Sequence, residues 1–329
     1  MSSGRRISIL IIFCALVIIA FMSSLINGSV DISVSQVLSG IFEIGNADID
    51  ETKQQILQNI RLPRTIVAML VGINLSLSGA ILQAVMKNPL ADPHIIGISS
   101  GAGLFGIFVM LVKSDAGSLV TPAAFIGAML AALLIYILAW KDGIRPIRVI
   151  LAGVAVSAFL GAGISAMLIF YSDKVHGALL WMVGGLSARS WNHVEILYPY
   201  TIIGTILTFL GANHLNILQL GDEVAKGLGL RVDLVRTILT ATAALLAASA
   251  VCVVGLLGFV GLIIPHTARL LIGSDYRFLL PAAALLGAAV LTISDTFART
   301  IFAPTELPVG ILMAILGAPF FLFLLRKEL

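Results

Sequence analysis

The sequence predicts an all-α polytopic membrane protein with about ten transmembrane helices, in a single domain that spans residues 1–329. Of these residues, 59% are hydrophobic and 11% are charged, and the mean hydropathy is +1.07. Soluble globular domains contain roughly 45–50% apolar and about 25% charged residues. Apolar runs close to the ~20 residues that cross a bilayer recur along the whole chain. Together these observations exclude an ordinary soluble domain.

Ten apolar segments are predicted to cross the membrane. The first follows Arg5 and Arg6 and resembles a signal peptide in its position. It is long for the apolar region of a signal peptide, and the residues after it form a poor cleavage site, so we expect a retained span. The ten segments cover residues 7–26, 64–86, 95–112, 119–140, 149–171, 195–213, 237–255, 258–272, 279–297 and 308–325.

The distribution of Lys and Arg predicts how the chain is oriented. If the N-terminus is cytoplasmic, the cytoplasmic segments carry 13 of the 20 Lys and Arg residues and the outer segments carry 7. An excess of these residues marks the cytoplasmic side of a membrane protein. An even number of spans also returns the basic C-terminal sequence RKEL to that side. We therefore expect a multi-pass protein of the cytoplasmic (inner) cell membrane with both termini in the cytoplasm.

The sequence shows no metal-binding or nucleotide-binding motif. The two cysteines, Cys14 and Cys252, lie within apolar runs, which argues against a disulfide framework or a thiolate metal site. The five histidines lack HExxH spacing. A P-loop, GxxxxGK followed by Ser or Thr, is missing as well. We expect no catalytic residue, no metal ligand and an energy source on another chain.

Ionisable residues cluster at the ends of the predicted spans. Ion-coupled transporters instead bury such groups near the middle of the membrane. The partial exception is Asp295, which has Arg299 one helical turn later and is expected to pair with it. A stand-alone secondary transporter is the alternative function, and a membrane enzyme is a third one for which the sequence offers no residues.

One charged stretch, LGDEVAKGLGL at residues 220–230, departs from the apolar pattern. It lies between the sixth and seventh predicted spans, on the predicted cytoplasmic side. Leu220, Val224 and Leu228 repeat every four positions, which predicts a short helix with one apolar face.

The charges of this stretch favour a protein partner. Asp222 and Lys226 have the spacing and order of a favourable i,i+4 pair, and Gly227 and Gly229 are expected to end or bend the helix. Helices that lie on a membrane surface are usually basic, whereas this one has two acidic residues and one Lys. We therefore interpret the segment as a docking element for another protein.

Several sequence blocks, in this order along the chain, resemble FecCD-type permeases. These are the membrane subunits of ATP-driven importers for iron–siderophores, haem and vitamin B12. The blocks are RLPR at 61–64, SGAILQAVMKNPLADPHIIGISSGAG at 78–103, LGDEVAKGLGL at 220–230, GFVGLIIPHTARLLIGSDYR at 258–277 and LPVGILMAILGAPFFLFLL at 307–325.

The resemblance implies a type II ABC importer permease that works by alternating access. Its implied partners are a second copy of itself or a related permease, two copies of a cytoplasmic ATP-binding subunit, an extracytoplasmic substrate-binding protein and the lipid bilayer, with no nucleic acid. The chain itself binds no cofactor, because ATP and Mg are used by the partner ATPase. A ferric siderophore is the first expected substrate, followed by haem or cobalamin.

The resemblance also implies roles for individual residues. The cytoplasmic coupling segment, about 214–236, contacts the ATPase, while Arg61, Arg64 and Arg299 receive acidic residues of the binding protein. The alternative for these three arginines is that they cap helix ends or snorkel. The family closes its path near the start of the fifth span, here IRPIR at 144–148. The implied ATPase-coupling residues are Leu220, Gly221, Asp222, Glu223, Ala225, Lys226, Leu228 and Gly229.

Overall fold

The computed structural model describes residues 3–42, 49–94, 97–113, 115–141, 143 and 145–328. Within these ranges the chain is helical, with short connections and no β-strand. Seven of the described helices are long and apolar enough to cross a membrane, and three shorter apolar helices bring the set to ten. The predicted all-α class and the number of spans are confirmed.

The ten helices correspond one to one with the ten predicted segments. In chain order they are α1 (Ser3–Ile26), α4 (Leu62–Val85), α5 (Ile98–Val112), α6 (Val120–Ala139), α7 (Pro146–Phe170), α9 (Trp191–Leu210), α12 (Val232–Val254), α13 (Val260–Ile272), α14 (Tyr276–Thr300) and α15 (Val309–Glu328).

The structure also contains short helices between the spans. α9 ends at Leu210, three residues before the approximate end predicted for the sixth span, and a new helix begins at Ala212. Before α4, a π-helical segment continues the preceding short helix without a break. The short elements are α2 (Val34–Phe42), α3 (Glu51–Gln55), η1 (Ile56–Arg61), η2 (Gly117–Leu119), η3 (Ser172–Lys174), α8 (Val175–Val183), α10 (Ala212–Gln219) and α11 (Asp222–Gly227).

α4 lies at the centre of the bundle. In the most apolar part of its span 78% of the residues are buried, against 22% in α1, α7 and α9. Gly72 packs against the backbone of Gly287 in α14, and Gly79 packs against the backbone of Gly261 in α13. A Cβ atom at Gly72 or Gly79 would collide with that backbone. Small residues at these crossings therefore let the helices approach closely, as in other membrane bundles.

Polar side chains join α4 to its neighbours. Asn74 donates a hydrogen bond to Ser249 Oγ in α12 at 3.1 Å, and Ser78 donates to the carbonyl of Ala243 at 2.7 Å. All four residues are fully buried. Interhelical hydrogen bonds of this kind hold helices together where no water can satisfy a polar group.

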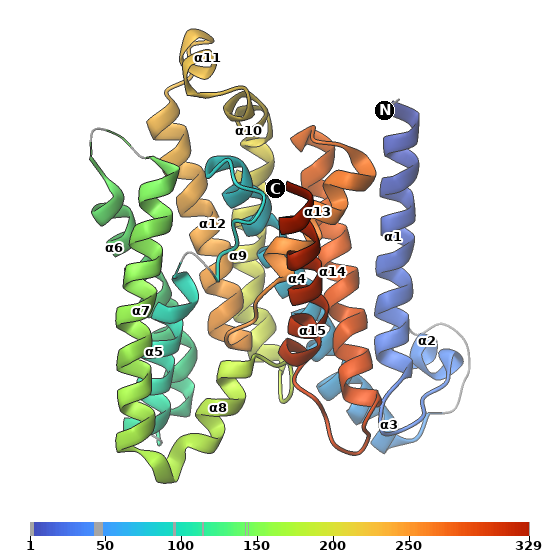
Figure 1. Cartoon of the computed structure of the whole chain (residues 1–329). Coiled ribbons are helices and arrows are strands. Elements are labelled where there is room, and N and C mark those ends of the chain that lie inside the picture. Colours follow the sequence, from blue (N-terminus) through green and yellow to red (C-terminus); the bar gives the residue numbers. More distant parts are fainter. Residues whose placement is uncertain are drawn as a thin grey trace.

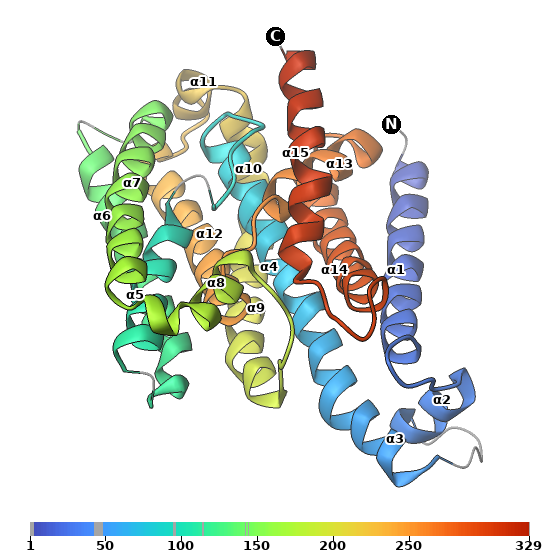
Figure 2. The same cartoon turned by 60° about the horizontal axis from the view of Figure 1, so that its bottom comes forward.

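The two ends of the bundle carry different short helices. Both termini lie toward the end that carries α10 and α11, which we call the α11 end (Figures 1 and 2). α3 and α8 lie at the opposite end, the α8 end (Figure 1). α5, α6 and α7 form one side of the bundle, and α1, α14 and α15 form the other.

Candidate functional site

α11 projects from the bundle as a helix of six residues (Figure 1). Gly221 precedes it with φ +105°, and Gly229 follows it with φ +83°. Glycine adopts such positive φ angles without the steric cost that a side chain incurs. The two glycines therefore let the chain turn out of α10 into α11, and out of α11 toward α12.

The apolar side chains of this segment face away from the bundle. Leu220, Val224 and Leu228 are 60%, 50% and 62% exposed, whereas Ala225 is fully buried. The predicted short helix with an apolar face is confirmed. Burying apolar surface stabilises an association by roughly 25 cal/mol per Å², so these three side chains are suited to contact another surface.

Asp222 joins α11 to two other parts of the chain. Its carboxylate accepts a hydrogen bond from Lys87 Nζ at 2.6 Å and from Arg236 Nη2 at 3.0 Å. Lys87 follows the C-terminus of α4, and Arg236 lies in the first turns of α12 with only 1% of its surface exposed. Burial by itself raises the pKa of Asp222, but the hydrogen bonds from Lys87 and Arg236 outweigh it and hold that pKa below its ordinary value.

The predicted pairing of Asp222 with Lys226 is wrong. Lys226 is exposed and lies outside the ion pairs of the described residues, while Asp222 binds Lys87 and Arg236. The tertiary fold presents two cations to the carboxylate at once, and an exposed i,i+4 pair is worth only about 0.3–0.5 kcal/mol. Lys87 and Arg236 are the site residues that sequence reasoning missed, since their proximity to Asp222 depends on the packing of α4 and α12.

α10 is anchored separately. Asn216 donates a hydrogen bond to Asp275 Oδ1 at 2.9 Å and accepts one from the backbone N–H of Tyr276 at 2.9 Å. The Arg277 guanidinium, with a closest contact of 2.7 Å, lowers the pKa of Asp275, although burial opposes it. The coupling segment is thus attached to α4 and α12 through Asp222 and to the start of α14 through Asn216.

The residues implied in ATPase coupling lie in α11 and directly before and after it. Glu223 and Lys226 are exposed beside the apolar side chains, and Ala225 packs inward. Their contact with an ATPase stays a prediction.

Arg61, Arg64 and Arg299 lie close to the α8 end, and all three are buried. They are 3%, 5% and 7% exposed. Arg61 donates to the carbonyls of Leu25 at 2.7 Å and Ile26 at 2.8 Å, and also to that of Val30. In this chain the guanidinium of Arg61 therefore ties the start of α4 to the end of α1.

The expected pairing of Asp295 with Arg299 is wrong. Asp295 instead accepts two hydrogen bonds from Arg64, with Nε at 2.8 Å and Nη2 at 2.9 Å. Arg299 donates to the carbonyl and the hydroxyl of Ser24 in α1. The planar fork of Arg64 matches both carboxylate oxygens, which is a stronger arrangement than a single contact along one helix.

Arg64 has a second acidic partner that the sequence did not indicate. Its Nη1 donates to Glu306 Oε2 at 2.8 Å, and the Ser187 hydroxyl donates to the same oxygen at 2.9 Å. Burial alone raises the pKa of Glu306, but the charge and hydrogen bond of Arg64 outweigh it and lower that pKa. The three arginines are thus occupied by acceptors within the chain, and their docking to a binding protein stays a prediction.

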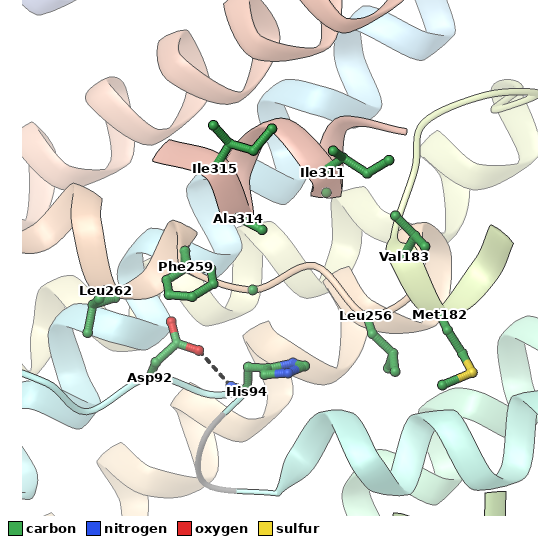
Figure 3. A pocket seen from close by; sticks show the side chains of 12 residues that line it. Asp92, His94, Met182, Val183, Leu256, Phe259, Leu262, Ile311, Ala314 and Ile315 are labelled. Carbon is green, nitrogen blue, oxygen red and sulfur yellow. Dashed lines mark hydrogen bonds between the residues drawn. The ribbon is translucent and has the colours of Figure 1, made fainter. Parts of the chain in front are cut away.

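A cavity of about 450 Å³ lies between the connection after α4, the break between α12 and α13, and the start of α15 (Figure 3). Its lining is mostly apolar and includes Phe259 and Ile315. The buried Asp92 carboxylate accepts the backbone N–H of His94 at 2.8 Å (Figure 3). This pair fixes the connecting loop against the cavity and offers few polar groups to a bound molecule.

Among the residues that the structure describes, no group of three or more His, Cys, Asp or Glu side chains could hold a metal ion. Cys14 and Cys252 are free thiols. The sequence IRPIR, which marks the predicted gate region, lies partly outside the described residues, because residue 144 is not among them.

Comparisons with known proteins agree with this architecture. The model of the FecCD transport family matches residues 16–327. The chain is 41% identical over 325 residues to the Fe(3+)-citrate import system permease protein YfmE of Bacillus subtilis (strain 168), covering 98% of this chain and 96% of that protein. It is 43% identical over 281 residues to the cobalamin import system permease protein BtuC of Halobacterium salinarum, covering 85% of this chain and 76% of that protein.

A solved structure has the same fold. It is an inward-facing conformation of a metal-chelate type ABC transporter, and it superposes with a TM-score of 0.85 at 29% identity, covering 97% of this chain and 99% of that one. The family match covers nearly the whole chain, and both relatives align over most of it. The chain is a multi-span membrane permease that belongs to the FecCD transport family.

Proposed function

We propose that the chain is the permease subunit of an ABC importer that carries a metal chelate into the cytoplasm by alternating access. The observation that carries the proposal is α11, a short helix with exposed apolar side chains tied by Asp222 to α4 and α12. A ferric chelate is the first substrate, with haem or cobalamin next. Relatives named as permeases for ferric citrate and cobalamin support this choice.

In this proposal two copies of a cytoplasmic ATP-binding subunit receive α11, and ATP and Mg act only on those subunits. Movement of α11 reaches the C-terminus of α4 through Lys87 and the start of α12 through Arg236. Because α4 packs against α9, α12, α13 and α14, its displacement shifts the centre of the bundle. The α11 end is therefore cytoplasmic, and the α8 end receives a substrate-binding protein.

The exposed apolar sides of α7 and α15 fit both the bilayer and a second permease copy. Phe159 in α7 is 76% exposed, and Ile315 in α15 is 63% exposed. We assign the second copy, identical or related, to this part of the surface, with the substrate path along the interface between the two subunits.

The test is uptake by cells that lack only this chain, offered labelled ferric citrate, ferric hydroxamate, haem and cobalamin side by side. Wild-type chain is expected to restore one uptake, and Glu223→Lys is expected not to, at equal membrane levels. Glu195→Lys makes the same charge change on an exposed residue of α9 and serves as the matched control. Uptake that persists after ATP depletion, or full rescue by Glu223→Lys, would contradict the proposal in favour of a stand-alone secondary transporter.

A further inference from the structure

A second cavity, of about 370 Å³, lies near the α8 end between the end of α5, the start of α6 and α8. Lys113, Lys174, Arg189 and His193 line it, and none of its described lining residues is acidic. Binding pockets for small organic molecules usually begin at roughly 300 Å³. The cavity therefore has the size of a ligand site and an unbalanced positive charge.

The hydrogen bonds around Arg189 leave donors without acceptors. His193 Nδ1 lies 3.2 Å from the backbone nitrogen of Ser190 and 3.1 Å from its hydroxyl. Arg189 Nη1 has only a long contact, at 3.4 Å, with His193 Nε2. Arg189 Nε is buried with no acceptor at all.

The surroundings make positive charge at Arg189 unfavourable. Burial lowers its pKa, and the nearby Arg64 cation lowers it further. Glu306, which lines an adjoining cavity of about 300 Å³ together with Arg189, is bound to Arg64 and Ser187. A partly buried cation with an unpaired buried donor and no carboxylate of its own is stabilised by an anion from outside.

The remaining lining distinguishes between kinds of anion. Trp181, Met110 and Val120 give the cavity apolar walls beside its cations. A guanidinium binds a carboxylate through two parallel hydrogen bonds, and the apolar walls suit a carbon skeleton better than they suit inorganic phosphate. Lys113 and Lys174 are both exposed at the rim of the cavity, where they can neutralise further carboxylates of the same anion.

We propose that this cavity is a binding site for a small organic polycarboxylate, with Arg189 as its anchor and Lys113 and Lys174 at its rim. Its position near the α8 end places it on the side from which the proposed substrate enters. The binding itself does not depend on transport, so its failure would leave the proposed function untouched.

The test uses the full chain in nanodiscs of phosphatidylcholine, titrated with citrate by calorimetry at constant ionic strength. Citrate is expected to bind saturably, and Arg189→Gln is expected to weaken its binding by about tenfold or more, because the charged hydrogen bonds of the guanidinium to the anion are lost. The double variant Lys113→Gln/Lys174→Gln changes only exposed side chains and is expected to weaken binding without affecting folding. Lys53→Gln in α3 removes the same charge elsewhere near this end and is the matched control.

Three results would overturn the proposal. One is equal citrate affinity in the wild type and in both cavity variants. Another is inorganic phosphate binding as tightly as citrate. The last is no citrate binding in phosphatidylcholine, together with Arg189-dependent retention of phosphatidylglycerol, which would make the cavity a lipid headgroup site.

A change in Trp181 fluorescence on adding citrate, lost in Trp181→Phe, would place the bound anion in this cavity.

Discussion

Two carboxylates, Asp222 at the α11 end and Asp295 toward the α8 end, hold arginines in different surroundings. The Asp222 side chain is 40% exposed and binds Arg236 and Lys87. The Asp295 side chain is 2% exposed and binds both oxygens to Arg64. Water can reach the half-exposed Asp222 carboxylate and replace a contact that it loses when a partner arrives, whereas Asp295 and Arg64 are both buried and must stay paired. The first arrangement suits a moving connection, and the second suits a fixed one.

The largest effect is expected from Asp295→Asn. It leaves Arg64 buried with one acidic partner fewer, and removal of one partner from a buried pair costs about 3–5 kcal/mol. We expect a lower midpoint in thermal unfolding of the detergent-purified chain and lower membrane levels. Glu306→Gln, at a side chain that is 41% exposed, is the comparison and should cost less. Equal stability of the two variants would show that burial of the Asp295 carboxylate does not raise the cost of losing its charge.

A smaller effect on stability, but a larger one on transport, is expected from Asp222→Asn. The neutral side chain weakens the contacts to Lys87 and Arg236 by about 1.5–3 kcal/mol, the usual range for hydrogen bonds to charged groups. Uptake should fall about tenfold while the rate of ATP hydrolysis by the assembled transporter is retained. Arg326→Gln, which removes an exposed cation near the end of α15 and outside the coupling segment, is the control. Loss of transporter assembly in Asp222→Asn would show a structural role instead.

The apolar side chains of α11 should matter for binding rather than folding. Leu228→Ser removes a side chain that is 62% exposed, and surface substitutions usually change stability by less than about 0.5 kcal/mol. We expect co-purification of the ATP-binding subunit to weaken while thermal unfolding is unchanged. Leu322→Ser, at a 64% exposed position of α15, tests whether any exposed leucine has the same effect.

The smallest effect is expected from pH. The folded-state pKa values of Asp222 and Glu306 are lowered, so their contribution to stability is present above the pKa of the unfolded carboxyls, about 4, and is lost as pH falls through the folded pKa. Thermal unfolding should therefore be flat with respect to these two groups between pH 7 and pH 5, and should shift downward only below about pH 4. A downward shift between pH 7 and pH 5 that Asp222→Asn abolishes would contradict the lowered pKa of Asp222.

Much of the fold follows from local composition. A run of apolar residues crosses a bilayer because each residue contributes its own transfer free energy, whatever its neighbours in space. The ten spans could therefore be predicted in order, while their ends shifted where Gly211 or the π-helical η1 altered the helix. The charged stretch at 220–230 was recognisable for the same reason, since its glycines and charges interrupt the apolar pattern.

The sequence by itself thus determined the class of protein, the number of spans and the position of α11. Only the tertiary structure decided which charges pair. Asp222 binds Lys87 across 135 positions, and Asp295 binds Arg64 across 231, while the partners expected one helical turn away are not used. A hydrogen bond depends on distances of about 3 Å between atoms. Those distances are set by how α4, α12 and α14 pack, which no local pattern records.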